Sequence, residues 1–210
     1  MSEHAVKHAE TGHPIHELLA KRWSPYAFDP VPVEPEKLRS CLEAARWAAS
    51  SFNEQPWSFI IAARNDEAEF GRMVGCLMEA NQGWASKAGV LMLTAIRKHF
   101  SRNDKPNRVA EHDLGLAIGN LTLQAVDLGL AVHQMAGVNL SDVRQTYAIA
   151  DTHEPMTAIA LGYAADPSRV EDENLAQRDL APRARKPLSD FVFAGRWGQA
   201  APVVKLESQL

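Results

Sequence analysis

The sequence predicts a protein of the α/β or α+β class. Short apolar runs typical of strands alternate with longer segments whose apolar residues recur at helical spacing. The chain has 210 residues, of which 46% are hydrophobic, so it can bury one large core or two small ones. We find no internal repeat in the sequence.

The first predicted helix spans Pro14–Arg22, because proline suits a first helical position. Residues 30–35 form an extended, proline-punctuated linker. A second helix begins at Pro35 and buries one face, whose members follow helical spacing: Leu38, Cys41, Leu42, Ala45 and Ala49.

The middle of the chain contains the clearest strand, Val90–Ile96, which is apolar on both faces and therefore central in a sheet. It is preceded by a strand at Trp57–Ala62 and by a helix at Glu67–Ala85 that Asn81–Gly83 should break. Residues 97–112 are charged, interrupted by proline and without periodicity, so we expect a long, mobile loop that acts as a lid.

Asp113–Leu128 is the most hydrophobic predicted helix and is apolar nearly all round, which indicates burial and makes a subunit interface possible. Gly115 and Gly119 allow close helix packing, and Gly129 can end the helix. The remaining expectations follow in chain order: a strand at Leu130–Met135, a short helix ending near Tyr147, a strand at Met156–Tyr163, a mobile polar excursion at 166–182, a basic cluster at 183–187 and an amphipathic tail at Leu188–Trp197.

Composition excludes several classes of function. A net charge of -4 argues against nucleic-acid binding, which normally needs a basic face. No stretch approaches the roughly 18 apolar residues of a membrane span, and residues 1–12 lack the apolar core of a signal peptide and should be flexible. The two cysteines, Cys41 and Cys76, lie in apolar surroundings and indicate reduced core thiols, so we expect a cytoplasmic protein. The eight histidines are scattered, which predicts no metal site.

Common catalytic signatures are also absent from the sequence, including GxGxxG after a strand, the GxxxxGK[ST] phosphate loop and the GxSxG nucleophile elbow. A turn at 50–55 instead offers mainly hydroxyls and amides, which suits a flat heterocycle with polar edges, although such loops are usually polar for solvation alone. Near the first helix, Arg22 and Ser24 either contact a phosphate or ring edge or belong to a surface turn. Cationic clusters at the two chain ends could converge on one phosphate.

Four sequence segments resemble the nitroreductase family of FMN-dependent oxidoreductases. They are RWSPYAF at 22–28, AARWAASSFNEQPW at 44–57, the helix and strand at 113–137, and RKPL at 185–188. The resemblance runs from about Pro14 to Phe193. It implies a single α+β domain over residues 1–210, with a central mixed or antiparallel sheet flanked by helices, and an interlocked homodimer that holds two FMN molecules at its interface.

The resemblance also implies a set of cofactor-binding residues. In one subunit, Arg22, Trp23 and Ser24 would contact the phosphate, ribityl chain and ring edge, and Arg183, Arg185 and Lys186 would hold the phosphate. Asn81 and Trp84 would touch the pyrimidine end, and Gln134, Met135, Ala136 and Gly137 would line the ring. Ser50, Ser51, Asn53 and Gln55 would approach from the other subunit. Tyr26 and Trp84 stand where members of the family carry cations, and Ala49 replaces a common proline.

The activity implied by this resemblance is a ping-pong reaction with no catalytic side chain, in which NADH or NADPH reduces the flavin and a nitroaromatic, quinone or similar small acceptor is then reduced. The alternatives are a variant flavin enzyme of the same fold, such as a reductive dehalogenase or a flavin-destroying enzyme, and a non-catalytic FMN-binding dimer.

Overall fold

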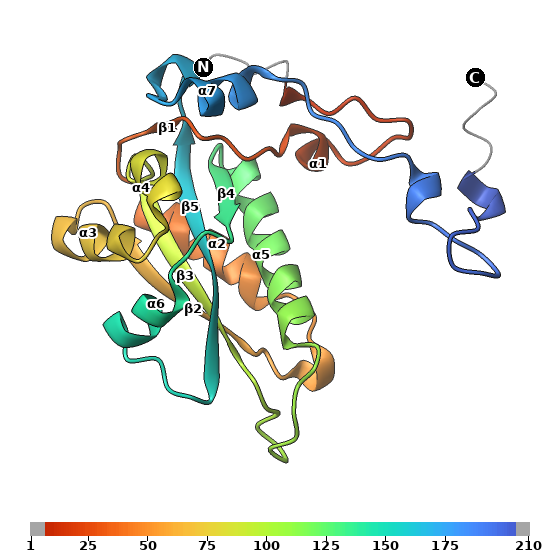
Figure 1. Cartoon of the computed structure of the whole chain (residues 1–210), viewed down its shortest axis with the longest axis horizontal. Helices are drawn as coiled ribbons and strands as arrows, with labels where there is room; N and C mark the ends of the chain where they lie inside the picture. The colour runs from red at the N-terminus through yellow and green to blue at the C-terminus, as the bar shows by residue number, and fades with distance from the viewer. Residues whose placement is uncertain (1–6, 205–210) are drawn as a thin grey trace.

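The computed structural model describes residues 7–204, which form a sheet with helices on both faces and an arm that leaves this body (Figure 1). The helices are α1 Glu17–Lys21, α2 Pro35–Arg46, α3 Glu67–Gly75, α4 Glu79–Ala85, α5 Ala110–Asp127, α6 Leu140–Thr146 and α7 Glu173–Leu180. The strands are β1 Phe28–Asp29, β2 Trp57–Ala63, β3 Val90–Arg97, β4 Ala131–Met135 and β5 His153–Ala164.

The five strands form one antiparallel sheet. Its order is β1-β5-β3-β2, and β4 pairs with the same strand β5. Strand β3 lies between β2 and β5, and every residue from Val90 to Ile96 is buried, so the predicted central strand is confirmed. Together with its flanking helices the sheet makes the protein α+β, which settles the choice left open between the two classes.

The core has two halves, one on each face of the sheet. Val90 and Met92 of β3 pack with α2 and α5, whereas the alternate residues Leu91 and Leu93 pack with α3 and α4. This alternation follows from the pleat of a strand that is covered on both sides. It fixes α5 firmly against the sheet, with its N-terminal end near the Ser50–Gln55 turn (Figure 1).

The helix predicted at Glu67–Ala85 is two helices, and the predicted break at Asn81–Gly83 is wrong. The chain leaves the first helix at Cys76–Met78, where Leu77 forms a β-bridge with Val138 and the Met78 N–H donates to the Gly137 carbonyl at 3.0 Å. Asn81–Gly83 instead lie inside α4. Pairing with a segment 60 residues away, which no local pattern reveals, therefore sets the break.

The two predicted mobile loops contain more regular structure than expected. Helix α5 begins at Ala110, so the loop between β3 and α5 spans only residues 98–109, and His99 pairs with Pro106 inside it. Residues 166–182 contain α7, whose N-terminus is capped by the Asp172 carboxylate through bonds to two backbone N–H groups. The segment expected to be a mobile polar loop therefore contains a helix, and its mobility stays a prediction.

The N-terminal segment is only partly covered by the described residues. Residues 1–6 lie outside them, but Lys7, within the segment expected to be flexible, is buried. Helix α1 is shorter than the predicted Pro14–Arg22, because the His16 side chain accepts the Leu18 N–H and sets the start there. The two-residue strand β1 carries no periodic signal and was not predicted.

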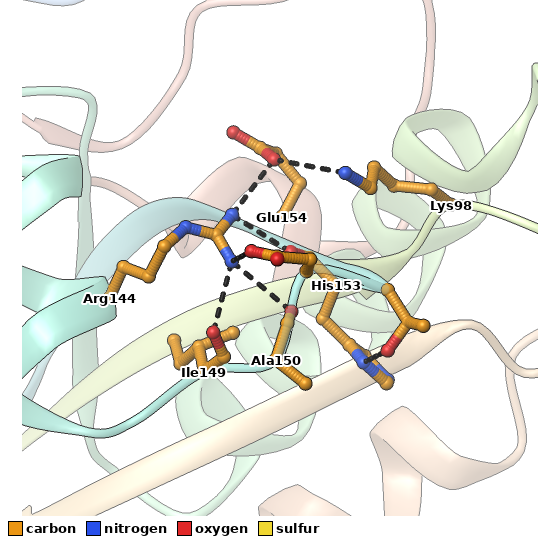
Figure 2. A network of polar contacts seen from close by, with 8 residues as sticks. Lys98, Arg144, Ile149, Ala150, His153 and Glu154 are labelled. Carbon is orange, nitrogen blue, oxygen red and sulfur yellow. Dashed lines mark hydrogen bonds and ion pairs between the residues drawn. The ribbon is translucent and has the colours of Figure 1, made fainter.

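A network around Arg144 fixes the turn between α6 and β5 (Figure 2). The guanidinium donates to three backbone carbonyl oxygens, those of Ile149, Ala150 and His153, at 2.9 to 3.1 Å. It also donates to the Glu154 carboxylate at 3.0 Å, which lies 3.8 Å from the Lys98 ammonium. The network links the start of β5 to the beginning of the 98–109 loop.

The C-terminal segment after α7 runs past α1 and away from the sheet (Figure 1). The amphipathic tail expected at Leu188–Trp197 contains one 3-10 turn, Leu188–Asp190, and is otherwise irregular. Its aromatic side chains find little cover within this chain, since Trp197 is 93% exposed and Phe191 58% exposed. Within residues 7–204, no helix combines the length and the apolar composition that crossing a membrane requires.

Candidate functional site

Three arginines from opposite ends of the chain meet beside α1. Burial lowers the pKa of Arg22, and the charges of Arg183 and Arg185 lower it further. The pKa of Arg183 is lowered by burial and then by Arg185. None of the three forms an ion pair with a carboxylate of residues 7–204, so positive charge accumulates here. The cluster is suited to bind an anion such as a phosphate.

Buried contacts between the two chain ends hold this cluster in place. The Arg183 guanidinium donates to the carbonyls of Lys7 and Ala20 at 3.1 and 2.6 Å. The Lys7 ammonium donates to the carbonyls of Arg178 and Ala181 at 2.6 and 2.5 Å. Arg183 therefore fixes the segment before α1 as well as adding charge, whereas the Arg22 guanidinium bonds only to the Ser24 hydroxyl, at 3.1 Å, among described residues.

A buried carboxylate, Asp179 of α7, completes this scaffold. It accepts hydrogen bonds from the backbone N–H groups of Tyr26 and Ala27, both at 2.9 Å. Burial raises the pKa of Asp179, and these bonds and the charge of Lys7 oppose that rise. The carboxylate thus fixes the backbone directly after Arg22 and Ser24.

Three rings form a wall next to the arginines. The His133 ring centroid lies 4.6 Å from that of Tyr26 and 4.5 Å from that of Trp84, and the Tyr26 and Trp84 rings meet edge to face at 5.2 Å. His133 Nδ1 lies 2.8 Å from the Pro25 carbonyl, which can only accept, so the proton sits on Nδ1. Burial lowers the pKa of His133, which keeps the ring neutral at pH 7.

The end of β4 adds a backbone edge to this wall. Asn81 donates from Nδ2 to the Gly137 carbonyl at 3.0 Å and accepts at Oδ1 from the Trp84 indole at 3.3 Å. A Cβ on Gly137 would lie 2.3 Å from that Nδ2, so only glycine allows this approach. Gln134 and Ala136 are exposed along the same edge, and Met135 is buried.

The Ser50–Gln55 turn is fixed by its own polar groups. The Gln55 N–H donates to the Ser50 hydroxyl at 3.0 Å, and the Ser51 N–H donates to the buried Asp113 carboxylate at 3.0 Å. Three residues of the turn, Phe52, Asn53 and Gln55, have φ between 51° and 56°. Left-handed backbone at three non-glycine residues is costly, and such outliers concentrate at functional sites.

The turn and the arginine cluster lie at opposite ends of α5 within one chain (Figure 1). The turn bonds to Asp113 in the first turn of the helix, whereas Lys21 and Trp23 line a hollow with Val126 and Leu130 at its other end. Asp113 and Val126 are separated by about 20 Å along the axis, at roughly 1.5 Å per residue. The predicted residues therefore form two separate groups.

The first group contains most of the predicted residues: Arg22, Trp23, Ser24, Tyr26, Asn81, Trp84, Gln134, Met135, Ala136, Gly137, Arg183 and Arg185. Lys186 is exposed and makes no hydrogen bond or ion pair with a described residue, so its role rests on sequence alone. The second group contains Ser50, Ser51, Asn53 and Gln55.

Four residues that build or support the site were not predicted from the sequence: Lys7, Asp113, His133 and Asp179. Of these, only Asp113 carried a usable signal, as an acidic residue in the first turn of the most hydrophobic helix. Among residues 7–204, no three His, Cys, Asp or Glu side chains gather where they could hold a metal ion.

An α+β protein with an arginine cluster, a neutral aromatic wall and a glycine-lined strand end is suited to bind an anionic, planar ligand. The nitroreductase family model matches residues 19–163, and the chain belongs to this family. A protein of Mycolicibacterium smegmatis described as an uncharacterized 15.4 kDa protein is 34% identical over 129 residues, which are 61% of this chain and 84% of that protein.

Solved structures show the same fold. A crystal structure described as an oxidoreductase containing FMN is 35% identical, covers 91% of this chain and 96% of its own, and has a TM-score of 0.85. An FMN-dependent nitroreductase from Clostridium difficile R20291 is 23% identical and covers 75% of this chain and 91% of its own, with a TM-score of 0.61. The latter likeness concerns the fold alone.

Proposed function

We propose that this protein is an FMN-dependent oxidoreductase that takes electrons from NADH or NADPH and passes them to a nitroaromatic, quinone or similar acceptor. The observation that carries the proposal is the convergence of Arg22, Arg183 and Arg185 near the His133 ring, whose pKa the Arg22 charge also lowers. The FMN named for a structure that is 35% identical and covers 91% of this chain supports the choice of cofactor.

The residues present fit this cofactor at both of its ends. The Arg22, Arg183 and Arg185 guanidiniums pair with no carboxylate of residues 7–204, and they suit a phosphate because arginine presents planar donors to phosphate oxygens. The half-buried rings of Tyr26 and His133, with the buried Trp84 ring packed against both, suit a flat ring. Both ring-side positions where the family resemblance implies cations carry neutral aromatics here, Tyr26 and Trp84.

Each part of the site has a distinct role in this proposal. Arg22 and Arg185 bind the phosphate, and the Ser24 hydroxyl orients Arg22. His133 keeps its proton at Nδ1 and stays neutral, so it supports the wall without adding charge. When bound, the flavin supplies the redox chemistry by accepting a hydride and returning it to a second substrate. Because the sequence has no separate dinucleotide-binding motif, both substrates use the same pocket in turn.

We further propose that the working form is a homodimer in which Ser50, Ser51, Asn53 and Gln55 reach the flavin of the other copy. One chain holds the two groups about 20 Å apart along α5, which side chains do not bridge. Residues Gly115, Leu116, Gly119 and Asn120 form an uncovered stripe on that helix. An added Cβ at Gly115 or Gly119 meets nothing within 4 Å, so the close packing expected there has no partner among residues 7–204.

The exposed arm at 188–204 also supports the dimer. Phe191, Trp197 and Val203 are 58%, 93% and 75% exposed, and together they present apolar surface that a second copy would bury. Light scattering coupled to gel filtration tests this part, and a monomer that retains stoichiometric FMN would contradict it.

An absorption spectrum of the purified protein tests the proposed function. We expect flavin absorbance that bleaches when NADH or NADPH is added anaerobically. The double variant Arg22→Ala with Arg185→Ala should lose FMN while its circular dichroism stays native. Arg39→Ala is the matched control, because within residues 7–204 Arg39 pairs only with Glu36, on the exposed side of α2. A colourless protein that cannot be reconstituted with FMN would refute the proposal.

A further inference from the structure

An exposed aromatic and cationic group stands on the Ser50–Gln55 turn. The Arg102 guanidinium lies 3.9 Å from the centroid of the Phe52 ring and 5.5 Å from that of Phe100. The two rings meet edge to face at 5.7 Å. Despite this contact, Phe52 remains 71% exposed. We call Phe52, Phe100 and Arg102 the Phe52 platform.

The backbone at Phe52 is unusual for so large a residue. Its φ is 54°, in the left-handed region that bulky side chains rarely adopt. A residue held in this conformation normally gains compensating burial, yet this ring is mostly exposed to solvent. Strain without burial indicates a functional role for the ring, since burial does not account for the cost.

The loop at 98–109 is fastened to this turn, which makes the platform rigid. The Ser101 N–H and hydroxyl donate to the two oxygens of Glu54 at 2.7 and 3.1 Å. Inside the loop, the Phe100 N–H donates to the Lys105 carbonyl at 2.9 Å. Phe100 and Arg102 therefore stand beside Phe52 on two segments that are joined by hydrogen bonds.

The charge of Arg102 has no partner carboxylate among residues 7–204. Stacking on the ring uses the flat face of the guanidinium and leaves its in-plane N–H donors free. A cation with free, planar donors next to an exposed ring is suited to a ligand that combines a flat ring with an anionic group.

We propose that the Phe52 platform binds the electron acceptor, and that this acceptor is a planar aromatic carrying a negative charge. The inference rests on the proposed function, because the platform stands on the turn that we expect to reach the flavin. The ligand ring packs against Phe52 and Phe100, and Arg102 binds its carboxylate. NADH and NADPH also combine flat rings with anionic groups. The test must therefore distinguish binding of the acceptor from binding of the nucleotide.

Calorimetric titration of the oxidised holoenzyme, without any reductant, measures binding independently of turnover. The probes are 4-nitrobenzoate and its neutral analogue 4-nitrobenzamide. We expect the wild type to prefer the benzoate, and Arg102→Gln to weaken benzoate binding about fivefold while leaving the amide unchanged, as for the loss of one exposed charge pair. Arg108→Gln is the matched control, because it removes one exposed charge from the same loop.

Equal affinity of the wild type for the two probes would overturn the proposal, as would a preference that survives in Arg102→Gln. Anaerobic reduction of the flavin by NADH and NADPH reports nucleotide binding separately from acceptor binding. We expect Arg102→Gln to leave this reduction unchanged. Weakened nucleotide binding with unchanged benzoate binding would overturn the assignment to the acceptor. A colourless sample would refute the proposal that the protein binds FMN. A sample that contains flavin but shows no preference for the benzoate would refute only the proposed role of the Phe52 platform.

Discussion

The two ends of α5 carry different kinds of binding surface. At its C-terminal end, Lys7, Arg22 and Arg183 come together from segments up to 176 residues apart, through bonds such as that from Arg183 to the Lys7 carbonyl. At its N-terminal end, the Ser50–Gln55 turn combines strained backbone and a short-range bond from the Gln55 N–H to Ser50 with a single longer-range anchor on α5, Asp113, and a link to the 98–109 loop through Ser101. The first surface depends on the packing of the chain ends, and the second depends on local backbone geometry.

This difference determines how each end responds to mutation. The arginine end contains buried charges, Lys7 and Asp179, whose stability depends on satisfied partners. The turn end holds three residues at positive φ, so part of its backbone is strained. Mutations of these buried groups at the first end should cost stability and ligand binding together, whereas mutations at the second end should separate the two.

The largest effect is expected for Asp179→Ala. It leaves the Tyr26 and Ala27 N–H groups without acceptors and removes a counter-charge from buried Lys7, so the free energy of unfolding should fall by about 2–4 kcal/mol. Urea denaturation measures the change. Asp142→Ala, an exposed carboxylate on α6, is the control, and equal destabilisation by both variants would contradict the role of Asp179.

Gly137→Ala should have a smaller but clear effect. The new methyl would lie 2.3 Å from Asn81 Nδ2, so the Asn81–Gly137 bond must break or the strand end must shift, at a cost of about 1–3 kcal/mol. Gly83→Ala is the matched control inside α4, where the methyl meets nothing within 4 Å and should stabilise by about 0.5–1 kcal/mol. Thermal unfolding of the two variants should shift in opposite directions.

Gln55→Gly tests the strain at the turn. Gln55 has a φ of 51°, which glycine adopts at no steric cost, so stability should stay unchanged or rise by up to about 1 kcal/mol. The variant also loses an amide proposed to reach the flavin, so fluorescence titration should show weaker FMN binding. A large loss of stability with intact FMN binding would contradict the claim that the strained turn serves ligand binding rather than stability.

The smallest expected effect concerns pH and His133. Because burial lowers the pKa of this imidazole below 6.5, the unfolded chain binds more protons at acidic pH, and stability contributed by neutral His133 is lost as pH falls below about 6.5. His133→Gln should flatten this dependence between pH 7 and 5 by up to about 1 kcal/mol. An unchanged pH profile of the melting temperature would show that the imidazole does not titrate with unfolding.

Much of the fold could be predicted because local periodicity determines it. The fully apolar run at 90–96 indicated the central strand, and Pro35 marked the start of α2, which begins there. The break at Cys76–Met78 could not be found in the same way, since distant pairing with Val138 determines it. The same holds for the site. The cationic clusters near both chain ends could be recognised from the sequence, whereas the burial of Lys7 and Asp179 depends on tertiary packing and could not.

The claim that one site needs two copies can be tested by complementation. Arg22→Ala with Arg185→Ala would be placed in one chain, Asn53→Ala with Gln55→Ala in a second, differently tagged chain, and the mixed dimer purified. Each variant alone should bind little FMN. The mixed dimer should bind one FMN for every two chains, because one of its two sites then combines an intact arginine cluster with an intact turn. A mixed dimer that binds no FMN, while the wild-type dimer does, would show that both groups act within a single chain.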